Sequence, residues 1–190
     1  MNTDKPRFQI RCEHLELAFA KAPITGYVVE CGVARGTSLR WLVSLAHKNQ
    51  RIFGFDSFEG LPEDWVMSED ITVPAGAFEC EIPDIEGAEL RLGLFSESLP
   101  TWKTEHPGRI AFLHIDADLY SSAVTILEEL NDQIVPGTVI AFDDMFESLR
   151  HQYWEQGEYK AFQEWQKTYD RKVYKLFDTE LEQASFRIIQ

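Results

Sequence analysis

The sequence predicts an α/β fold, in which a mostly parallel β-sheet carries helices on both faces. Five short apolar runs alternate with segments whose apolar residues recur at helical spacing, and two β-rich runs close the chain. Strands that are covered on both faces read as continuous apolar runs. With 190 residues, of which 44% are hydrophobic, the chain can bury a core of its own. We therefore expect one domain over residues 1–190.

The predicted elements follow one another in the order typical of such a fold. Strands are expected over residues 26–31, 51–56, 89–95, 110–116 and 138–144. Helices are expected over residues 11–20, 37–45, 97–103, 124–130 and 155–168. Thr37 or Ser38 is expected to cap the second of these helices. The two terminal β-rich runs are residues 172–177 and 184–189.

Residues 58–87 interrupt this alternation. They contain three glycines and three prolines, many acids and no Lys or Arg. Connections of this length without regular structure are unusual in compact domains, and they commonly form binding loops or lids. We expect an acidic insert that contributes to a binding site.

The net charge of the chain bears on which classes of molecule it can bind. Lys and Arg number 18 against 32 Asp and Glu, which gives a net charge of -14 and a pI of about 4.7. Such a charge argues against nucleic acid or an anionic membrane as a partner. Two windows, residues 52–90 and 110–149, contain no Lys or Arg and hold many of the acids. Solvated surface is the ordinary explanation of such runs. The acids at the ends of predicted strands are the candidates for a functional role.

Cysteine usage and the N-terminus bear on the compartment. The chain has three cysteines without a CxxC pair, which favours a reducing environment over a disulfide framework or a zinc site. The first ten residues lack the apolar stretch of a leader, and no run of the chain approaches eighteen apolar residues. We expect a cytoplasmic protein.

The end of the first predicted strand has features of a nucleoside-binding turn. Glu30, Gly32 and Gly36 form an ExGxxxG pattern at a strand-to-helix turn, where glycines let the backbone pass close to a ligand. The third glycine of the dinucleotide pattern is absent. Asp56 follows Gly36 by twenty residues, the distance at which an acid reaches ribose hydroxyls. Glu30 adds a second carboxylate, which suits a cation such as the sulfonium of S-adenosylmethionine. A tight turn of any α/β protein is the alternative.

Four aspartates follow the fourth and fifth predicted strands. Asp116 and Asp118 end one strand and Asp143 and Asp144 end the next, with no Lys or Arg in the local sequence. Neighbouring carboxylates raise one another's pKa unless a cation is present, so a divalent ion with oxygen ligands explains the set economically. Helix capping by one Asp of each pair, or solvated strand ends, would also account for it.

Taken together, these motifs resemble the class I S-adenosylmethionine-dependent methyltransferases, and among them the macrocin-type (TylF-like) sugar O-methyltransferases. The matching segments, in the family's order, are residues 28–39, 52–62, 92–100, 110–122 and 136–145. The resemblance implies a Rossmann-like seven-stranded methyltransferase sheet whose last strand is antiparallel. The segment before the first motif is short for this family, and in longer members it takes part in substrate closure or subunit contacts. The acceptor therefore stays open, and a homo-oligomer is compatible with the sequence.

The resemblance also implies roles for individual residues. Magnesium would be held by Asp116, Asp143 and Asp144, with Asp118 as the general base and Asp116 required for turnover. The cofactor-binding motifs fall on Glu30, Gly32, Gly36, Thr37, Ser38, Asp56, Ser57 and Phe58, with Phe95 or Ser96 where adenine usually lies.

The sequence therefore predicts a magnesium-dependent O-methyltransferase that transfers a methyl group from S-adenosylmethionine to a small-molecule hydroxyl, such as that of a sugar or another vicinal diol. One alternative is a metal-dependent nucleotide-sugar glycosyltransferase that uses Asp116-Ala117-Asp118 as its DxD motif. Another is a non-catalytic module that binds S-adenosylmethionine and acts through a partner.

Overall fold

A computed structural model of the chain describes residues 6–148, 151–179 and 181–190. The first five residues, which belong to the N-terminal stretch considered above, lie outside this description. The same holds for Leu149, which ends the second acidic window.

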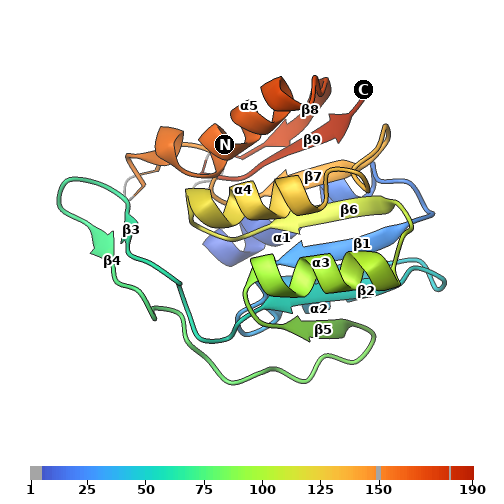
Figure 1. Cartoon of the computed structure of the whole chain (residues 1–190), viewed down its shortest axis with the longest axis horizontal. Helices are drawn as coiled ribbons and strands as arrows, with labels where there is room; N and C mark the ends of the chain where they lie inside the picture. The colour runs from blue at the N-terminus through green and yellow to red at the C-terminus, as the bar shows by residue number, and fades with distance from the viewer. Residues whose placement is uncertain (1–5, 149–150, 180) are drawn as a thin grey trace.

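The fold is built on a seven-stranded sheet with the order β5-β2-β1-β6-β7-β9-β8 (Figure 1). Its strands are β1 (Tyr27–Cys31), β2 (Ile52–Asp56), β5 (Glu89–Leu92), β6 (Ile110–Ile115), β7 (Val139–Phe142), β8 (Val173–Asp178) and β9 (Ala184–Ile188). The first five run parallel, whereas β9 inserts between β7 and β8 and is antiparallel to both. The mostly parallel sheet with an antiparallel last strand is thus confirmed.

Helices cover both faces of the sheet, as expected. On one face α1 (Arg7–Phe19) and α2 (Thr37–Leu45) bury Leu15 and Leu42. The other face is covered by α3 (Phe95–Glu105), α4 (Tyr120–Glu129) and α5 (Glu158–Thr168), preceded by the short 3-10 helix η1 (Trp154–Gln156). Within the described residues, no helix is long and apolar enough to cross a membrane.

Three local expectations are corrected by the structure. The first helix begins at Arg7, four residues before the predicted start. The cap of α2 is Gly36 in a left-handed conformation, and neither Thr37 nor Ser38 makes a capping hydrogen bond, because Thr37 is already the first helical residue. Phe95 does not end a strand: β5 stops at Leu92, and Phe95 opens α3.

The insert of residues 58–87 is more ordered than a plain loop. It contains a small antiparallel pair, β3 (Trp65–Val66) and β4 (Thr72–Val73), beside the carboxyl ends of the parallel strands (Figure 1). Leu61, Trp65 and Met67 pack with Leu119 in a small core of their own. The backbone amides of residues 152 and 153 donate to the Met67 carbonyl at 2.8 and 3.0 Å. These contacts tie the insert to the segment between β7 and α5.

Candidate functional site

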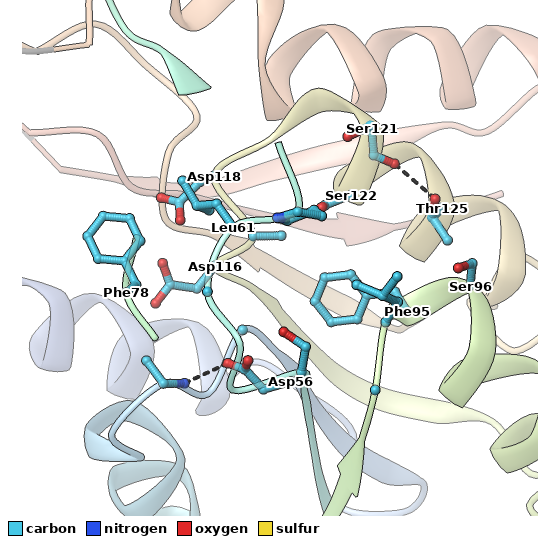
Figure 2. Close-up of a pocket in the computed structure, with 18 of the residues that line it drawn as sticks. Asp56, Leu61, Phe78, Phe95, Ser96, Asp116, Asp118, Ser121, Ser122 and Thr125 are labelled. Atoms are coloured by element: carbon cyan, nitrogen blue, oxygen red, sulfur yellow. Dashed lines mark hydrogen bonds between the residues drawn. The ribbon is translucent and has the colours of Figure 1, made fainter. Parts of the chain in front are cut away.

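A cavity of about 490 Å³ opens at the carboxyl ends of the parallel strands. Parallel α/β sheets place their ligand sites at this edge. Its walls come from the turn after β1, the end of β2, the insert, the start of α3 and the segment between β6 and α4 (Figure 2). The predicted site residues among its lining are Gly32, Asp56, Ser57, Phe95, Ser96, Asp116 and Asp118.

Gly32 brings the ends of β1 and β6 into direct contact. Its φ of +94° favours glycine, and a Cβ at this position would lie 1.8 Å from the carbonyl oxygen of Asp116. The Asp116 amide donates to the Cys31 carbonyl at 2.9 Å, and the Gly32 amide donates to the Phe55 carbonyl at the same distance. The predicted cofactor turn and the predicted metal strand therefore share one backbone junction.

Asp56 is held by backbone amides on both carboxylate oxygens. Its Oδ2 accepts hydrogen bonds from the amides of Val33 and Ala34 at 2.8 and 2.7 Å, and its Oδ1 accepts one from Phe58 at 2.7 Å. Each carboxylate oxygen has two acceptor positions, so Oδ1 keeps one for a ligand in the cavity. The carboxylate thus fixes the turn after β1 and still faces the site.

The remaining cofactor predictions fall away from the cavity wall. Glu30 does not face the crevice as expected, because it is fully buried within β1, where His114 Nδ1 lies 2.7 Å from its Oε1. Gly36 is covered by Ile85, whose Cδ1 would lie 2.4 Å from a Cβ at residue 36. Phe58 and Ser38 are buried, and the exposed Thr37 is not part of the lining.

The aspartates converge, in a different combination from the one predicted. Carboxylate oxygens of Asp116, Asp118 and Asp144 all lie within 4.8 Å of one another. Asp143, the expected third ligand, turns instead toward Arg11. Asp118, the expected base, takes its place in the group, which we call the acid cluster: Asp116, Asp118 and Asp144.

Arg11 is the site residue that sequence reasoning missed. It reaches from α1, and its Nη1 lies 3.1 Å from Asp116 Oδ2 while its Nη2 contacts Asp143 Oδ2. Among the described lining residues it is the only Lys or Arg. The local sequence around the aspartates gave no signal of it, because Arg11 lies 105 residues before Asp116. Burial disfavours the charged guanidinium, but Asp116, Asp143 and Asp144 outweigh that effect and raise the pKa of Arg11.

One arginine does not neutralise this many carboxylates. Burial, together with neighbouring charges that include Asp116, raises the pKa of Asp143 to about 7. Burial and the adjacent acids raise the pKa values of Asp118 and Asp144 well above their usual range. Asp143 Oδ1 is also buried without a hydrogen-bond partner in the described part of the chain. A site of carboxylate oxygens that is short of positive charge fits a hard divalent cation.

Asp118 has an unusual backbone. Its φ is +59°, a conformation that non-glycine residues seldom adopt, and the Leu119 amide donates to the Ala117 carbonyl at 2.5 Å across the turn. Such conformations cost free energy and concentrate at functional sites. The turn directs the Asp118 carboxylate into the cavity, opposite Phe78 of the insert (Figure 2).

The comparison with known families decides how this site is classified. The methyltransferase domain family matches residues 29–145, which is more than half of the chain. The chain belongs to this methyltransferase family. Its sheet order and antiparallel last strand are those of the class I S-adenosylmethionine-dependent methyltransferases, and the matched stretch includes the predicted cofactor turn and all four aspartates.

One relative of this chain is, by name, an O-methyltransferase that acts on a rhamnosyl group. The chain is 32% identical over 139 residues to 8-demethyl-8-(2,3-dimethoxy-alpha-L-rhamnosyl)-tetracenomycin-C 4'-O-methyltransferase from Streptomyces olivaceus. The match covers 64% of this chain and 53% of the relative, so the chain spans about half the length of that protein.

Solved structures show the same fold. The calicheamicin methyltransferase CalS11 aligns with a TM-score of 0.70 at 22% identity, over 94% of this chain and 77% of its own. The O-methyltransferase NovP aligns with a TM-score of 0.68 at 19% identity, over 97% of this chain and 80% of its own. An O-methyltransferase from Bacillus cereus, solved with SAH, aligns with a TM-score of 0.57 at 15% identity, over 100% and 83% of the two chains.

Proposed function

We propose that the chain is a TylF-like, magnesium-dependent O-methyltransferase that uses S-adenosylmethionine to methylate a hydroxyl of a sugar or another vicinal diol. The observation that carries this proposal is one cavity lined both by the turn after β1 and by Asp116 and Asp118 of the acid cluster. The relative named as a rhamnosyl 4'-O-methyltransferase supports the acceptor class. A carboxylate-lined cavity in a chain of net charge -14 also suits a small molecule better than a nucleic acid.

The cofactor would lie along the first two strand ends. Asp56 Oδ1 would accept a hydrogen bond from a ribose hydroxyl, and Gly32 would let the backbone approach the ligand. Phe95 and Ser96, at the start of α3, would border the adenine. We assign four other predicted cofactor residues, which are buried, to supporting the turn from behind; these are Glu30, Gly36, Ser38 and Phe58. The exposed Thr37 begins α2 outside the cavity.

The acid cluster would hold the magnesium ion. Asp116 and Asp144 would contribute carboxylate oxygens, and the third ligand would be Asp118 in the present arrangement or Asp143 if Arg11 turned away. When bound, S-adenosylmethionine supplies the methyl group, and magnesium lowers the pKa of the coordinated hydroxyl and orients it.

Asp118 would act as the base when Asp143 completes the ligand set. Burial and the neighbouring acids raise the pKa of Asp118, which makes its carboxylate a stronger proton acceptor than an ordinary aspartate. Asp118 would accept the proton that the acceptor hydroxyl gives up when its oxygen takes the methyl group. The products are the methyl ether and S-adenosylhomocysteine.

Phe78 would form the acceptor side of the cavity. The residue is 56% exposed although it lines the cavity, and its ring faces Asp116 and Asp118 (Figure 2). An exposed aromatic face offers an apolar surface to the C–H side of a sugar ring. The acceptor would then lie between this ring and the acid cluster.

The test combines calorimetry with turnover. We expect S-adenosylmethionine and S-adenosylhomocysteine to bind, and we expect methylation of a rhamnoside acceptor that chelator abolishes and magnesium restores. Binding of a nucleotide diphosphate sugar without S-adenosylhomocysteine binding would favour the glycosyltransferase alternative. Cofactor binding without methylation of any rhamnoside or diol would favour the non-catalytic module, and full turnover in metal-free buffer would remove magnesium from the proposal.

A further inference from the structure

Glu158 is a buried carboxylate whose two oxygens are both used by backbone amides. It is the first residue of α5 and has no exposed surface. Its Oε1 accepts a hydrogen bond from the Ala117 amide at 3.1 Å, and its Oε2 accepts one from the Asp144 amide at 3.2 Å. A single side chain therefore bridges the segments that directly follow β6 and β7.

The two bonded amides lie within the segments that carry the acid cluster. Ala117 stands between Asp116 and Asp118, just after β6, and the other amide belongs to Asp144, just after β7. Fixing these two amides fixes the distance between the strand ends. Glu158 thus acts on the positions of all three carboxylates of the cluster without being one of its members.

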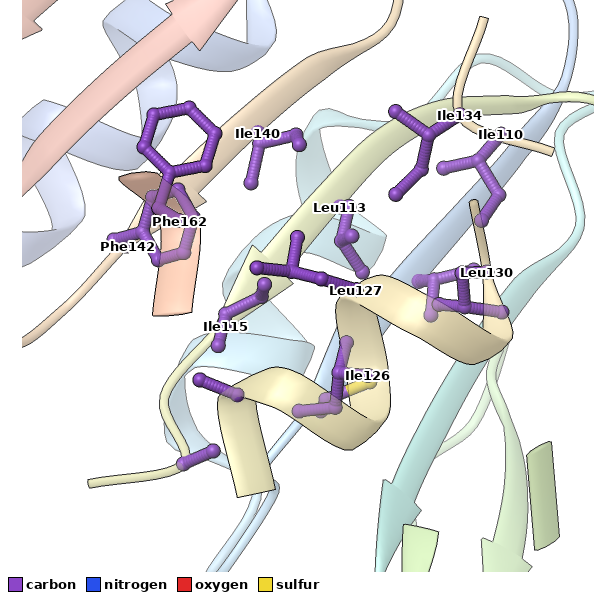
Figure 3. Close-up of a cluster of buried hydrophobic side chains, with 14 of the residues drawn as sticks. Ile110, Leu113, Ile115, Ile126, Leu127, Leu130, Ile134, Ile140, Phe142 and Phe162 are labelled. Carbon is purple, nitrogen blue, oxygen red and sulfur yellow. The ribbon is translucent and has the colours of Figure 1, made fainter. Parts of the chain in front are cut away.

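Packing against β7 holds helix α5 in the position from which Glu158 reaches both amides. Phe162, one turn after Glu158, packs on Phe142 of β7 with the ring centroids 4.8 Å apart. Figure 3 shows the two rings together at the edge of the buried cluster formed by β6, β7 and α4. The start of α5 therefore has a fixed position relative to the end of β7, and the Glu158 side chain is presented to both amides.

A carboxylate is a costly residue for a purely structural bridge at this place. Glu158 adds another buried acid to a region that already holds Asp116, Asp143 and Asp144. Burial, together with the charges of Asp116 and Asp143, raises its pKa well above the usual range. A neutral Gln would avoid that cost, but its side chain has one acceptor oxygen where Glu has two. Only the carboxylate can receive both amides in the observed geometry.

We propose that Glu158 is a positioning residue that sets the spacing of Asp116, Asp118 and Asp144 for a divalent cation. This inference rests on the proposed magnesium dependence. Residues behind metal ligands orient them, and their loss weakens metal binding or activity by about 10–100-fold.

The experiment compares Glu158→Gln with Glu164→Gln on the same helix. Glu164 is exposed and accepts a hydrogen bond from Tyr120 Oη, so its variant removes one acid of α5 outside the cavity. Manganese affinity is measured by calorimetry and by electron paramagnetic resonance, and S-adenosylhomocysteine affinity and thermal stability are measured on the same samples. We expect Glu158→Gln to weaken manganese binding by about 10–100-fold and to leave cofactor affinity unchanged, with Glu164→Gln like wild type.

Three outcomes would overturn the inference. Unchanged manganese affinity in folded Glu158→Gln would overturn this inference and leave the proposed function intact, because the wild-type protein would still bind the metal. Equal losses of manganese and cofactor affinity with a lower thermal midpoint would show a general structural role. Failure of the wild-type protein to bind manganese would overturn both this inference and the metal part of the proposed function. Should Glu158→Gln not fold, Glu158→Asp keeps the charge with a shorter reach, and the same weaker manganese binding is expected of it.

Discussion

Asp118 carries two constraints on one residue: a left-handed backbone and a carboxylate within the acid cluster. Sequence reasoning found the residue through the spacing of the aspartates but could not foresee its conformation. The backbone turn depends on the short contact between Ala117 and Leu119, and the choice of Asp118 over Asp143 depends on Arg11, which is remote in the sequence. The sequence therefore predicted which aspartates lie at the strand ends, but it did not predict which of them come together in the acid cluster.

Replacing Asp118 by Asn tests its role with little disturbance of the fold. Asn tolerates the left-handed region, so the turn is retained while the proton acceptor is lost. We expect the turnover number to fall by about 10²–10⁴-fold, with S-adenosylhomocysteine affinity unchanged in calorimetry. Asp132→Asn, at an exposed position after α4, is the matched control and should turn over like wild type. Near-normal turnover in Asp118→Asn would show that another group accepts the proton.

At the scale of elements, the buried parallel strands were the most predictable part of the fold. β1, β6 and β7 are almost entirely buried, so they appear in the sequence as unbroken apolar runs. The insert was less predictable, because β3 and β4 have two residues each and depend on contacts with residues 152 and 153. The start of α3 was misplaced, because the run of residues 89–95 continues its apolar pattern past Gly93, where the chain leaves the sheet.

The junction between β1 and β6 can be tested by adding one methyl group. Gly32→Ala would combine a left-handed φ with a Cβ 1.8 Å from the Asp116 carbonyl oxygen. We expect it to lower the free energy of unfolding by about 3 kcal/mol, as measured by chemical denaturation. Gly76→Ala is the control: it has a φ of +79° with nothing within 4 Å of the added Cβ, so we expect a loss of only about 1 kcal/mol. Equal losses in the two variants would mean that the contact with Asp116 relaxes freely.

For the whole molecule, the aspartates that follow β6 and β7 make stability depend on pH and, if the proposed function holds, on metal. The pKa of Asp143 rises from 3.8 to about 7 on folding, so between these values the folded chain binds more protons than the unfolded chain. Stability in chelator should therefore fall as pH rises through this window. Magnesium should offset the loss, raising the thermal midpoint more at about pH 8 than at about pH 5. A magnesium effect of the same size at both pH values would contradict a site built on these carboxylates.

The contact at Gly32 also has a consequence for how the two proposed ligands, the cofactor and magnesium, affect each other's binding. Because the same backbone junction borders the cofactor turn and the strand end that carries Asp116, occupancy on one side can change the free energy of binding on the other. Such a linkage is reciprocal: if magnesium changes the affinity for the cofactor by some factor, the cofactor changes the affinity for magnesium by the same factor. The junction would therefore couple the two binding equilibria through the edge of the sheet that both sites share.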